Sequence, residues 1–113
     1  MIKKCPPVVL QNFFEPCALF LLMKKPDYGY ELSKQLKKRC HCQTNVGNLY
    51  RGLNRMVKAG LITKKTAGSE IGPKKSVYTI TAEGKHYLSS WITELEKQNI
   101  AISELIKNYK KTI

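Results

Sequence analysis

Hydrophobic residues in this chain follow the 3.6-residue period of helices, interrupted by two short runs with the character of strands. The unbroken apolar run from Cys17 to Met23 predicts a first helix over residues 15–25, with Pro16 in its first turn, where a missing N–H costs nothing. This run is apolar nearly all round, so the helix must be buried on more than one side. In a chain of 113 residues, a second subunit is one surface that would bury it.

Two further helices are expected before the strands. One covers residues 28–39, with Asp27 as its N-cap, and the next covers residues 46–59, between an Asn45 cap and Gly60. The latter has an apolar stripe of helical period and, on the opposite face, a polar and basic row without a carboxylate. The row consists of Thr44, Asn48, Arg51, Arg55 and Lys58.

The two strand-like runs cover residues 61–66 and 76–80, and they flank the segment AGSEIGPKK. The glycines and proline of that segment are the turn residues that a hairpin tip needs. Lysine pairs stand on either side of the tip; they are Lys64, Lys65, Lys74 and Lys75. We therefore expect a two-stranded, lysine-rich hairpin.

A long last helix is expected from Ala82 to near the end of the chain, with Thr81 as its cap. Its apolar residues alternate steps of four and three over about three heptads, which is the seam of a coiled coil, with Asn99 as the polar residue that fixes register. Packing on its own domain gives the same steps, but the seam is longer than so small a core can cover, so self-association is favoured. The seam residues are Leu88, Ile92, Leu95, Asn99, Ile102 and Ile106.

Trp91 lies one residue before the seam residue Ile92. Two interpretations stay open for it: ordinary interface packing, or a ring that lines a dimer cavity and stacks on a flat apolar ligand.

Charge narrows the class of partner. The chain has 20 basic and 8 acidic residues, a net charge of +12, and the segment from Lys34 to Lys75 holds eleven Lys or Arg against one acid, Glu70. That segment therefore carries +10 of the +12, which indicates nucleic acid or an anionic membrane surface rather than a scattered solvated face. No apolar run reaches the length of a membrane span, and no cleavage site follows the N-terminal apolar segment, so a cytoplasmic protein is expected.

The sequence gives little support for metal binding, redox chemistry or catalysis. The cluster CHC at residues 40–42 cannot easily bring three consecutive side chains to one tetrahedral zinc, and no second ligand pair lies nearby, so no metal site is predicted. A redox switch remains an alternative to a structural role for Cys40 and Cys42. The chain has no glycine-rich phosphate loop, no nucleophile–base pair and no carboxylate cluster, so neither an enzyme nor a cofactor is expected.

The order of elements predicts a mainly α fold with a small β-hairpin wing, that is, a winged helix-turn-helix followed by a long dimerisation helix. We expect residues 1–81 to form a DNA-binding domain and residues 82–113 the dimerisation helix. A recognition helix over about residues 45–59 would enter the major groove, where Arg reads guanine and Asn reads adenine. The wing, residues 63–76, would contribute salt-dependent contacts to the phosphate backbone.

Three motifs in this order resemble the PadR-like family of transcriptional regulators, specifically its short members with one C-terminal helix. They are YGYEL at 28–32, GNLYRGLNRMVKAGLI at 47–62 and GPKKSVYTITAEGKHYL at 72–88. The resemblance implies that Tyr50 lies near the DNA backbone and that the first helix, with Phe20, and the last helix build a homodimer. It also implies repression of nearby genes and release by small hydrophobic ligands. Independently of the resemblance, two recognition helices related by a two-fold axis would read a pseudo-palindromic operator. Asn48 stands where the family usually has Thr or Ser, and Arg51 stands where it usually has Pro. These differences affect which operator sequence is read and not the fold.

A winged-helix adaptor that binds protein or RNA is the alternative, because one fold hosts unrelated functions. The basic row beside a lysine-rich wing favours DNA.

Overall fold

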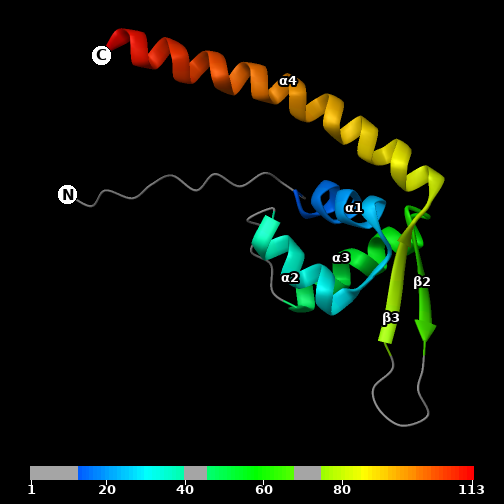
Figure 1. Ribbon diagram of the computed structural model, residues 1–113. Helices are drawn as coiled ribbons and strands as arrows, with labels where there is room; N and C mark the ends of the chain where they lie inside the picture. The colour runs from blue at the N-terminus through cyan, green and yellow to red at the C-terminus, as the bar shows by residue number, and fades with distance from the viewer. Residues whose placement is uncertain (1–12, 40–45, 68–74) are drawn as a thin grey trace.

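The computed structural model describes residues 13–39, 46–67 and 75–113. Helices and short strands alternate along the chain (Figure 1). The elements are α1 (Phe14–Lys24), β1 (Asp27–Tyr28), α2 (Gly29–Arg39), α3 (Val46–Lys58), β2 (Ile62–Ala67), β3 (Lys75–Ile80) and α4 (Ala82–Thr112). The mainly helical winged fold that the pattern predicted is confirmed.

The sheet has three antiparallel strands in the order β1-β3-β2, so the prediction of a two-stranded hairpin was incomplete. Asp27 and Tyr28 pair with Tyr78 and Val77 of β3, and α2 begins at Gly29 rather than at Tyr28. The Asp27 carboxylate accepts the N–H of Tyr28 at 2.9 Å, and both residues belong to β1. The prediction of Asp27 as the N-cap of this helix was therefore wrong, because its side chain binds the adjacent N–H and not one in the first turn of α2. A strand of two residues shows no alternation, which is why the sequence pattern did not reveal it.

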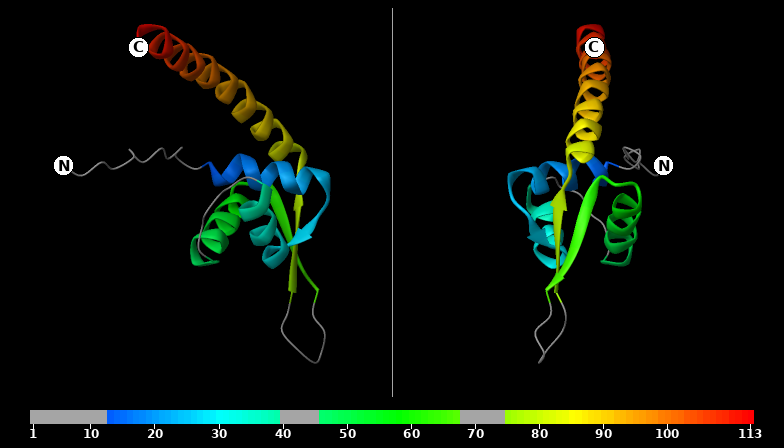
Figure 2. Two further views of the ribbon diagram at one scale, coloured as in Figure 1. Left: turned by 60° about the vertical axis from the view of Figure 1, so that its left-hand side comes forward. Right: turned by 90° about the vertical axis from the view of Figure 1, so that its right-hand side faces the viewer.

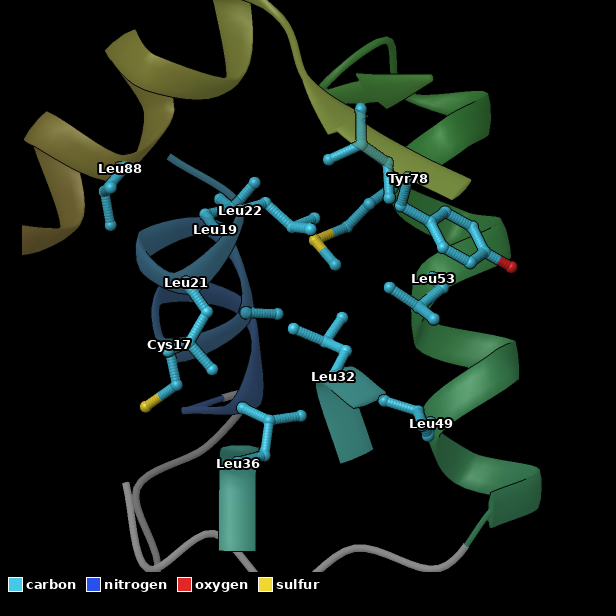
Figure 3. Close-up of a cluster of buried hydrophobic side chains, with 13 residues drawn as sticks. Cys17, Leu19, Leu21, Leu22, Leu32, Leu36, Leu49, Leu53, Tyr78 and Leu88 are labelled. Atoms are coloured by element: carbon cyan, nitrogen blue, oxygen red, sulfur yellow. The ribbon is translucent and has the colours of Figure 1, made fainter. Parts of the chain in front are cut away.

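The core forms around α1, which lies between α4 on one side and α2 with α3 on the other (Figures 1 and 2). Leu19 of α1, Leu36 of α2 and Leu53 of α3 are fully buried, and they converge with Tyr78 of β3 (Figure 3). The expectation that α1 is buried on more than one side holds for Cys17–Leu19 and Leu21–Leu22. Phe20 and Met23 remain exposed in the single chain.

Gly60 ends α3 as predicted, and the backbone conformation explains why glycine stands there. Its φ is +79°, a left-handed value that other residues adopt only under strain. The N–H of Gly60 donates to the Val57 carbonyl at 3.1 Å, and the N–H of Leu61 donates to the Met56 carbonyl at 3.0 Å. This pair of bonds is the Schellman motif, which turns the chain directly from α3 into β2.

A tight junction joins α4 to the rest of the domain. The Thr81 hydroxyl accepts the N–H of Gly84 at 3.0 Å, which confirms the predicted cap, and donates to the carbonyls of Gly60 at 2.7 Å and Leu61 at 2.9 Å. A Cβ at Gly84 would lie 2.1 Å from the Leu61 carbonyl oxygen, so only glycine allows this approach. The start of α4 is thereby fixed to the end of α3.

The 31-residue α4 passes over α1 and then extends away from the domain, at the opposite end from the tip of the sheet (Figures 1 and 2). Leu88 is buried in the core, whereas every residue beyond Leu95 is exposed. The chain consequently measures 64 Å along its longest axis. No helix in the described ranges combines the length and apolar character needed to cross a membrane.

Candidate nucleic-acid interface

The α3 helix has one buried face and one basic face. Leu49, Leu53 and Met56 are at most 1% exposed and hold the helix against α1 and α2. The opposite side is solvent-exposed; we call its residues Asn48, Arg51, Arg55 and Lys58 the α3 row. Thr44 and Asn45, which the sequence placed beside this row, lie outside the described residues.

Two members of the α3 row are paired with each other. The Arg51 guanidinium donates a hydrogen bond to the side-chain oxygen of Asn48, three residues earlier on the helix. This contact orients the guanidinium along the exposed surface. A planar group with several donors, held in this way, matches the acceptor edge of a guanine.

Arg55 has a partner that the sequence did not indicate. Its Nε lies 3.8 Å from Oε2 of Glu15, although the arginine side chain stays 62% exposed. Glu15 is nearly buried in the first turn of α1, where the helix dipole favours a negative charge. The α3 row is free of carboxylates along the helix itself, as expected, but the fold brings one to it from α1.

Glu15 also connects α3 to α4. Its Oε1 accepts the hydroxyl of Tyr87 at 2.9 Å. A hydrogen bond from Trp91 lowers the pKa of Tyr87, but partial burial and the neighbouring Glu15 carboxylate outweigh it, so the pKa is raised from the ordinary value. The side chains of Arg55, Glu15, Tyr87 and Trp91 therefore form a continuous polar chain from the α3 row to the last helix.

The wing, which we define as β2 and β3, exposes Lys64, Lys65 and Lys75, while Lys74 lies outside the described residues. Lys64 stands opposite Tyr78 in the ladder and Lys65 stands opposite Val77. Because successive residues of a strand point to opposite faces, Lys64 and Lys65 lie on different faces of the wing. Lys64 lines a pocket together with residues of α2 and α3, whereas Lys65 does not, so these two adjacent lysines do not form one patch.

Tyr50 of α3 packs across the start of α2. A Cβ added to Gly29 would lie 2.8 Å from both Cε1 and Oη of Tyr50, so the glycine makes room for this ring. The ring forms part of a pocket of about 420 Å3, the α2–wing pocket, which Tyr28, Lys64 and Tyr78 also line. Tyr50 is 38% exposed, so it lies at the surface beside the α3 row.

The predicted seam on α4 divides into two parts. Leu88 packs into the core of its own chain, and Leu95 is half-buried. Ile92, Ile102 and Ile106 are each more than 40% exposed, with values of 44%, 48% and 49%. We call Ile92, Leu95, Asn99, Ile102 and Ile106 the α4 seam.

A groove of about 390 Å3 runs beside the α4 seam, between Phe13 and the stretch from Ile92 to Ile102. On α1, Phe20 is 41% exposed, and the Lys24 ammonium lies 5.0 Å from the centre of its ring. Trp91 is half-buried.

Within the described residues, no group of three His, Cys, Asp or Glu is arranged to hold a metal ion. Cys40, His41 and Cys42 lie outside the described ranges. The Cys17 side chain is buried in the core.

Known proteins resemble the chain in sequence and in fold. The profile of the transcriptional regulator PadR-like family matches residues 18–90. An uncharacterised protein X of Lysinibacillus sphaericus is 30% identical over 100 residues, which covers 87% of this chain and 88% of that protein.

Solved structures give the same result. A PadR-like transcriptional regulator of Bacillus cereus is 31% identical, with a TM-score of 0.74 over 86% of this chain and 94% of its own. Bacillus subtilis PadR in complex with operator DNA is 26% identical, with a TM-score of 0.64 over 70% of this chain and 46% of its own.

Proposed function

The chain belongs to the PadR-like family of transcriptional regulators, and from that premise we propose that it is a sequence-specific DNA-binding repressor that acts as a homodimer. The observation that carries the proposal is the exposed α3 row beside a lysine-bearing wing. The relative from Bacillus subtilis, solved with operator DNA, supports DNA as the partner.

In this proposal α3 enters the major groove and Arg51 and Asn48 contact base edges. Arginine donates bidentately to guanine and asparagine pairs with adenine. Lys58 and the wing residues Lys64 and Lys75 contact phosphates, which adds affinity without sequence information. Thr44, Asn45, Lys65 and Lys74 remain proposed contacts on the sequence alone.

Dimerisation is supported by the apolar surface that the single chain leaves uncovered. The α4 seam continues beyond the last residue of α4 that packs on the domain, and Phe20 and Met23 are exposed on α1. Two copies related by a two-fold axis would bury these side chains and present two α3 helices to a pseudo-palindromic operator. We accordingly assign residues 1–81 to DNA binding and 82–113 to dimerisation, with Leu88 serving the core of the DNA-binding part.

Release by a small hydrophobic ligand is the third part of the proposal. Trp91 is half-buried beside the α4 seam and is hydrogen-bonded to Tyr87, which reaches Arg55 through Glu15. A ligand that displaced Trp91 would disturb this polar chain and with it the position of Arg55. The coupling requires different ligand contacts in the bound and free states.

The test is binding to the DNA just upstream of the gene, compared with random duplex of equal length, across a salt series. We expect a preference of about a thousandfold for the upstream fragment and a steep loss of affinity for both duplexes as salt rises. Arg51→Ala should reduce the preference by about 1–3 kcal/mol. Lys107→Ala removes the same charge from the exposed far part of α4 and should leave the preference unchanged.

Two results would contradict the proposal. Equal binding of the upstream fragment, of a pool of random duplexes and of every other fragment of the genome would indicate a non-specific DNA binder. No binding at low salt would favour a winged-helix adaptor for protein or RNA.

A further inference from the structure

Tyr78 of β3 is a polar residue in an apolar core. It is 1% exposed, and its hydroxyl has no hydrogen-bond partner among the described residues. A buried hydroxyl without a partner destabilises the fold by about 1–3 kcal/mol, so phenylalanine would give a more stable domain. Such a group in a native fold calls for an explanation.

The hydroxyl points away from the core. Figure 3 shows the Tyr78 ring extending past Leu53, with its oxygen as the outermost atom. Tyr78 is also one of the residues that line the α2–wing pocket, although its hydroxyl is covered. Burial, followed by the electrostatic interaction with neighbouring Tyr50, raises the pKa of Tyr78 above its ordinary value of 10.0, so the hydroxyl is protonated and is a hydrogen-bond donor at neutral pH.

The pocket also receives the N-terminus of α2. Gly29 begins this helix of 11 residues and lines the pocket together with Tyr30. The first four N–H groups of a helix have no partner within it, and the helix dipole places partial positive charge at this end. These two properties make a helix N-terminus suited to an anion.

The charged side chains around the pocket agree with an anionic occupant. Lys64 and Lys75 line it, and the Lys75 ammonium lies 5.7 Å from the centre of the Tyr28 ring. Glu31 also lines the pocket, but its carboxylate is 3.9 Å from the Lys34 ammonium, which offsets its charge. Two lysines and a helix N-terminus therefore outweigh one paired carboxylate.

The position of the pocket indicates which anion it meets. The N-terminal ends of α2 and α3 lie on the side of the domain toward which the end of β2 and the start of β3 point (Figures 1 and 2). Tyr50 of the pocket belongs to α3 itself. A duplex with α3 in its major groove would thus pass its backbone over the mouth of the pocket.

We propose that the α2–wing pocket binds one phosphodiester group of the DNA backbone. The Tyr78 hydroxyl and the first N–H groups of α2 donate hydrogen bonds to its oxygens, and Lys64 supplies a positive charge. The inference rests on the proposed function. Because the hydroxyl is covered in the free protein, the phosphate reaches it only after a wall side chain turns aside. Tyr50, exposed and in contact with the start of α2, is placed to do so.

Tyr78→Phe tests the inference because it removes only the hydroxyl. We expect the variant to melt at a higher temperature than the wild type and to bind DNA at least about tenfold more weakly, since a hydrogen bond to a charged group is lost. Specific and random duplexes should be affected equally, and the salt slope should not change because no charge is removed. Lys64→Ala, by contrast, should reduce the slope by about one.

Thr79→Val is the matched control. It removes a hydroxyl from the next residue of β3, which is exposed on the other face of the strand, and should bind DNA as the wild type does. A second measurement identifies the group that is contacted. Single phosphates of the duplex are replaced, one at a time, by uncharged methylphosphonates. At one position per half-site, the replacement should weaken DNA binding by the wild type but should not weaken DNA binding by Tyr78→Phe any further.

Several outcomes would overturn the inference. The first is DNA binding by Tyr78→Phe as strong as that by Thr79→Val, or a lower melting temperature of Tyr78→Phe, which would give the hydroxyl a structural partner. The second is a set of methylphosphonate effects that add to that of Tyr78→Phe at every position. The third is a stabilisation of the wild type by inorganic phosphate that exceeds the effect of chloride at equal ionic strength, together with a flat methylphosphonate scan, which would make free phosphate the occupant. In all these cases the wild type still prefers its upstream fragment; loss of that preference would instead contradict the proposed function.

Discussion

The winged domain and the far half of α4 are made of the same kinds of residue but are stabilised differently. From α1 to Leu88, apolar side chains meet in one core, and the largest of them are fully buried. Beyond Leu95, apolar residues such as Ile102, Leu105 and Ile106 are all exposed, with values from 48% to 71%. The first region is stabilised by its own contacts, whereas the second, among the described residues, buries no side chain beyond Leu95.

The two regions therefore differ in the source of their stability within a single chain. Most helical stability in proteins comes from packing of an apolar face, and isolated helices are marginal in water. In the proposed dimer the far half of α4 would be stabilised by a partner surface, whereas the winged domain has a core of its own. Mutations in the two regions should affect different measurements.

The largest effect is expected in the winged domain. Leu53→Ala removes a side chain that is 0% exposed at the centre of α3. It should lower the free energy of unfolding by about 2–5 kcal/mol, because both burial and packing are lost. Urea unfolding followed by circular dichroism measures this change. Leu105→Ala, the same substitution at a side chain that is 71% exposed, should cost less than about 0.5 kcal/mol. Equal costs at the two sites would show that the core is not where the structure places it.

The second effect concerns the proposed dimer. Ile102→Glu places a carboxylate on the α4 seam, and an unpaired charge buried in an interface should weaken association by about 3 kcal/mol or more, over 100-fold in dissociation constant. Sedimentation or light scattering across a concentration series measures it. Ser103→Glu adds the same charge one residue away, off the seam, and should remain dimeric. A dimer that persists in Ile102→Glu would mean that the seam is not the contact surface.

The third effect tests the connection between the two regions. Glu15→Gln keeps an oxygen that accepts the Tyr87 hydroxyl but removes the charge near Arg55. We expect DNA affinity to rise by up to about fivefold, since an ion pair whose arginine is largely exposed contributes about 0.2–1 kcal/mol that DNA binding no longer has to overcome. Glu94→Gln removes the same charge beside Lys97 on α4 and serves as the control. An unchanged affinity in both variants would mean that Glu15 does not restrain Arg55.

The smallest effect is a pH dependence confined to the core. The pKa of Tyr78 is raised by burial, and further by Tyr50, from an ordinary value of 10.0. The folded state therefore holds this proton more tightly than the unfolded state. The protonated Tyr78 hydroxyl therefore contributes to the free energy of unfolding at pH values below 10.0. This contribution is lost as the pH rises through the higher pKa that Tyr78 has in the folded protein. Thermal melts between neutral and strongly alkaline pH should show a steeper decline for the wild type than for Tyr78→Phe. Parallel declines would assign the alkaline sensitivity to other groups.

Elements with a long periodic pattern were predictable from sequence. The apolar stripe of α3, the Gly60 stop and the Thr81 cap each depend on local chemistry, and the structure has all three. The short strand β1 was missed because two residues carry no period, and its existence depends on β3, about 50 residues later. Leu88 fits the heptad as well as Ile92 does, and only the path of α4 over α1 distinguishes the buried residue from the exposed one.

Site residues that lie on one helix could be predicted from the sequence. Contacts between residues of different helices and strands could not. The α3 row follows from helical spacing alone. Glu15 reaches this row from another helix, and no spacing rule connects two residues that are 40 positions apart. Tyr78 was expected as an ordinary strand residue; its unpaired hydroxyl depends on how α2, α3 and the sheet meet. A glycine at the start of a helix, Gly29, is the sequence signal that could have indicated this meeting, since it makes room for the Tyr50 ring.

The junction at Thr81 and Gly84 has a consequence for operator geometry. Because α4 cannot swing freely where it leaves the wing, the separation of two α3 helices in a dimer would be set by the crossing of the two α4 helices. A flexible linker would tolerate half-sites at several spacings. This junction would not, and adding one base pair, which lengthens the duplex by about 3.4 Å and also rotates one half-site about its axis, should be enough to prevent simultaneous engagement of both halves. The junction would therefore act as a spacing gauge, selecting operators by the distance between half-sites as well as by their bases.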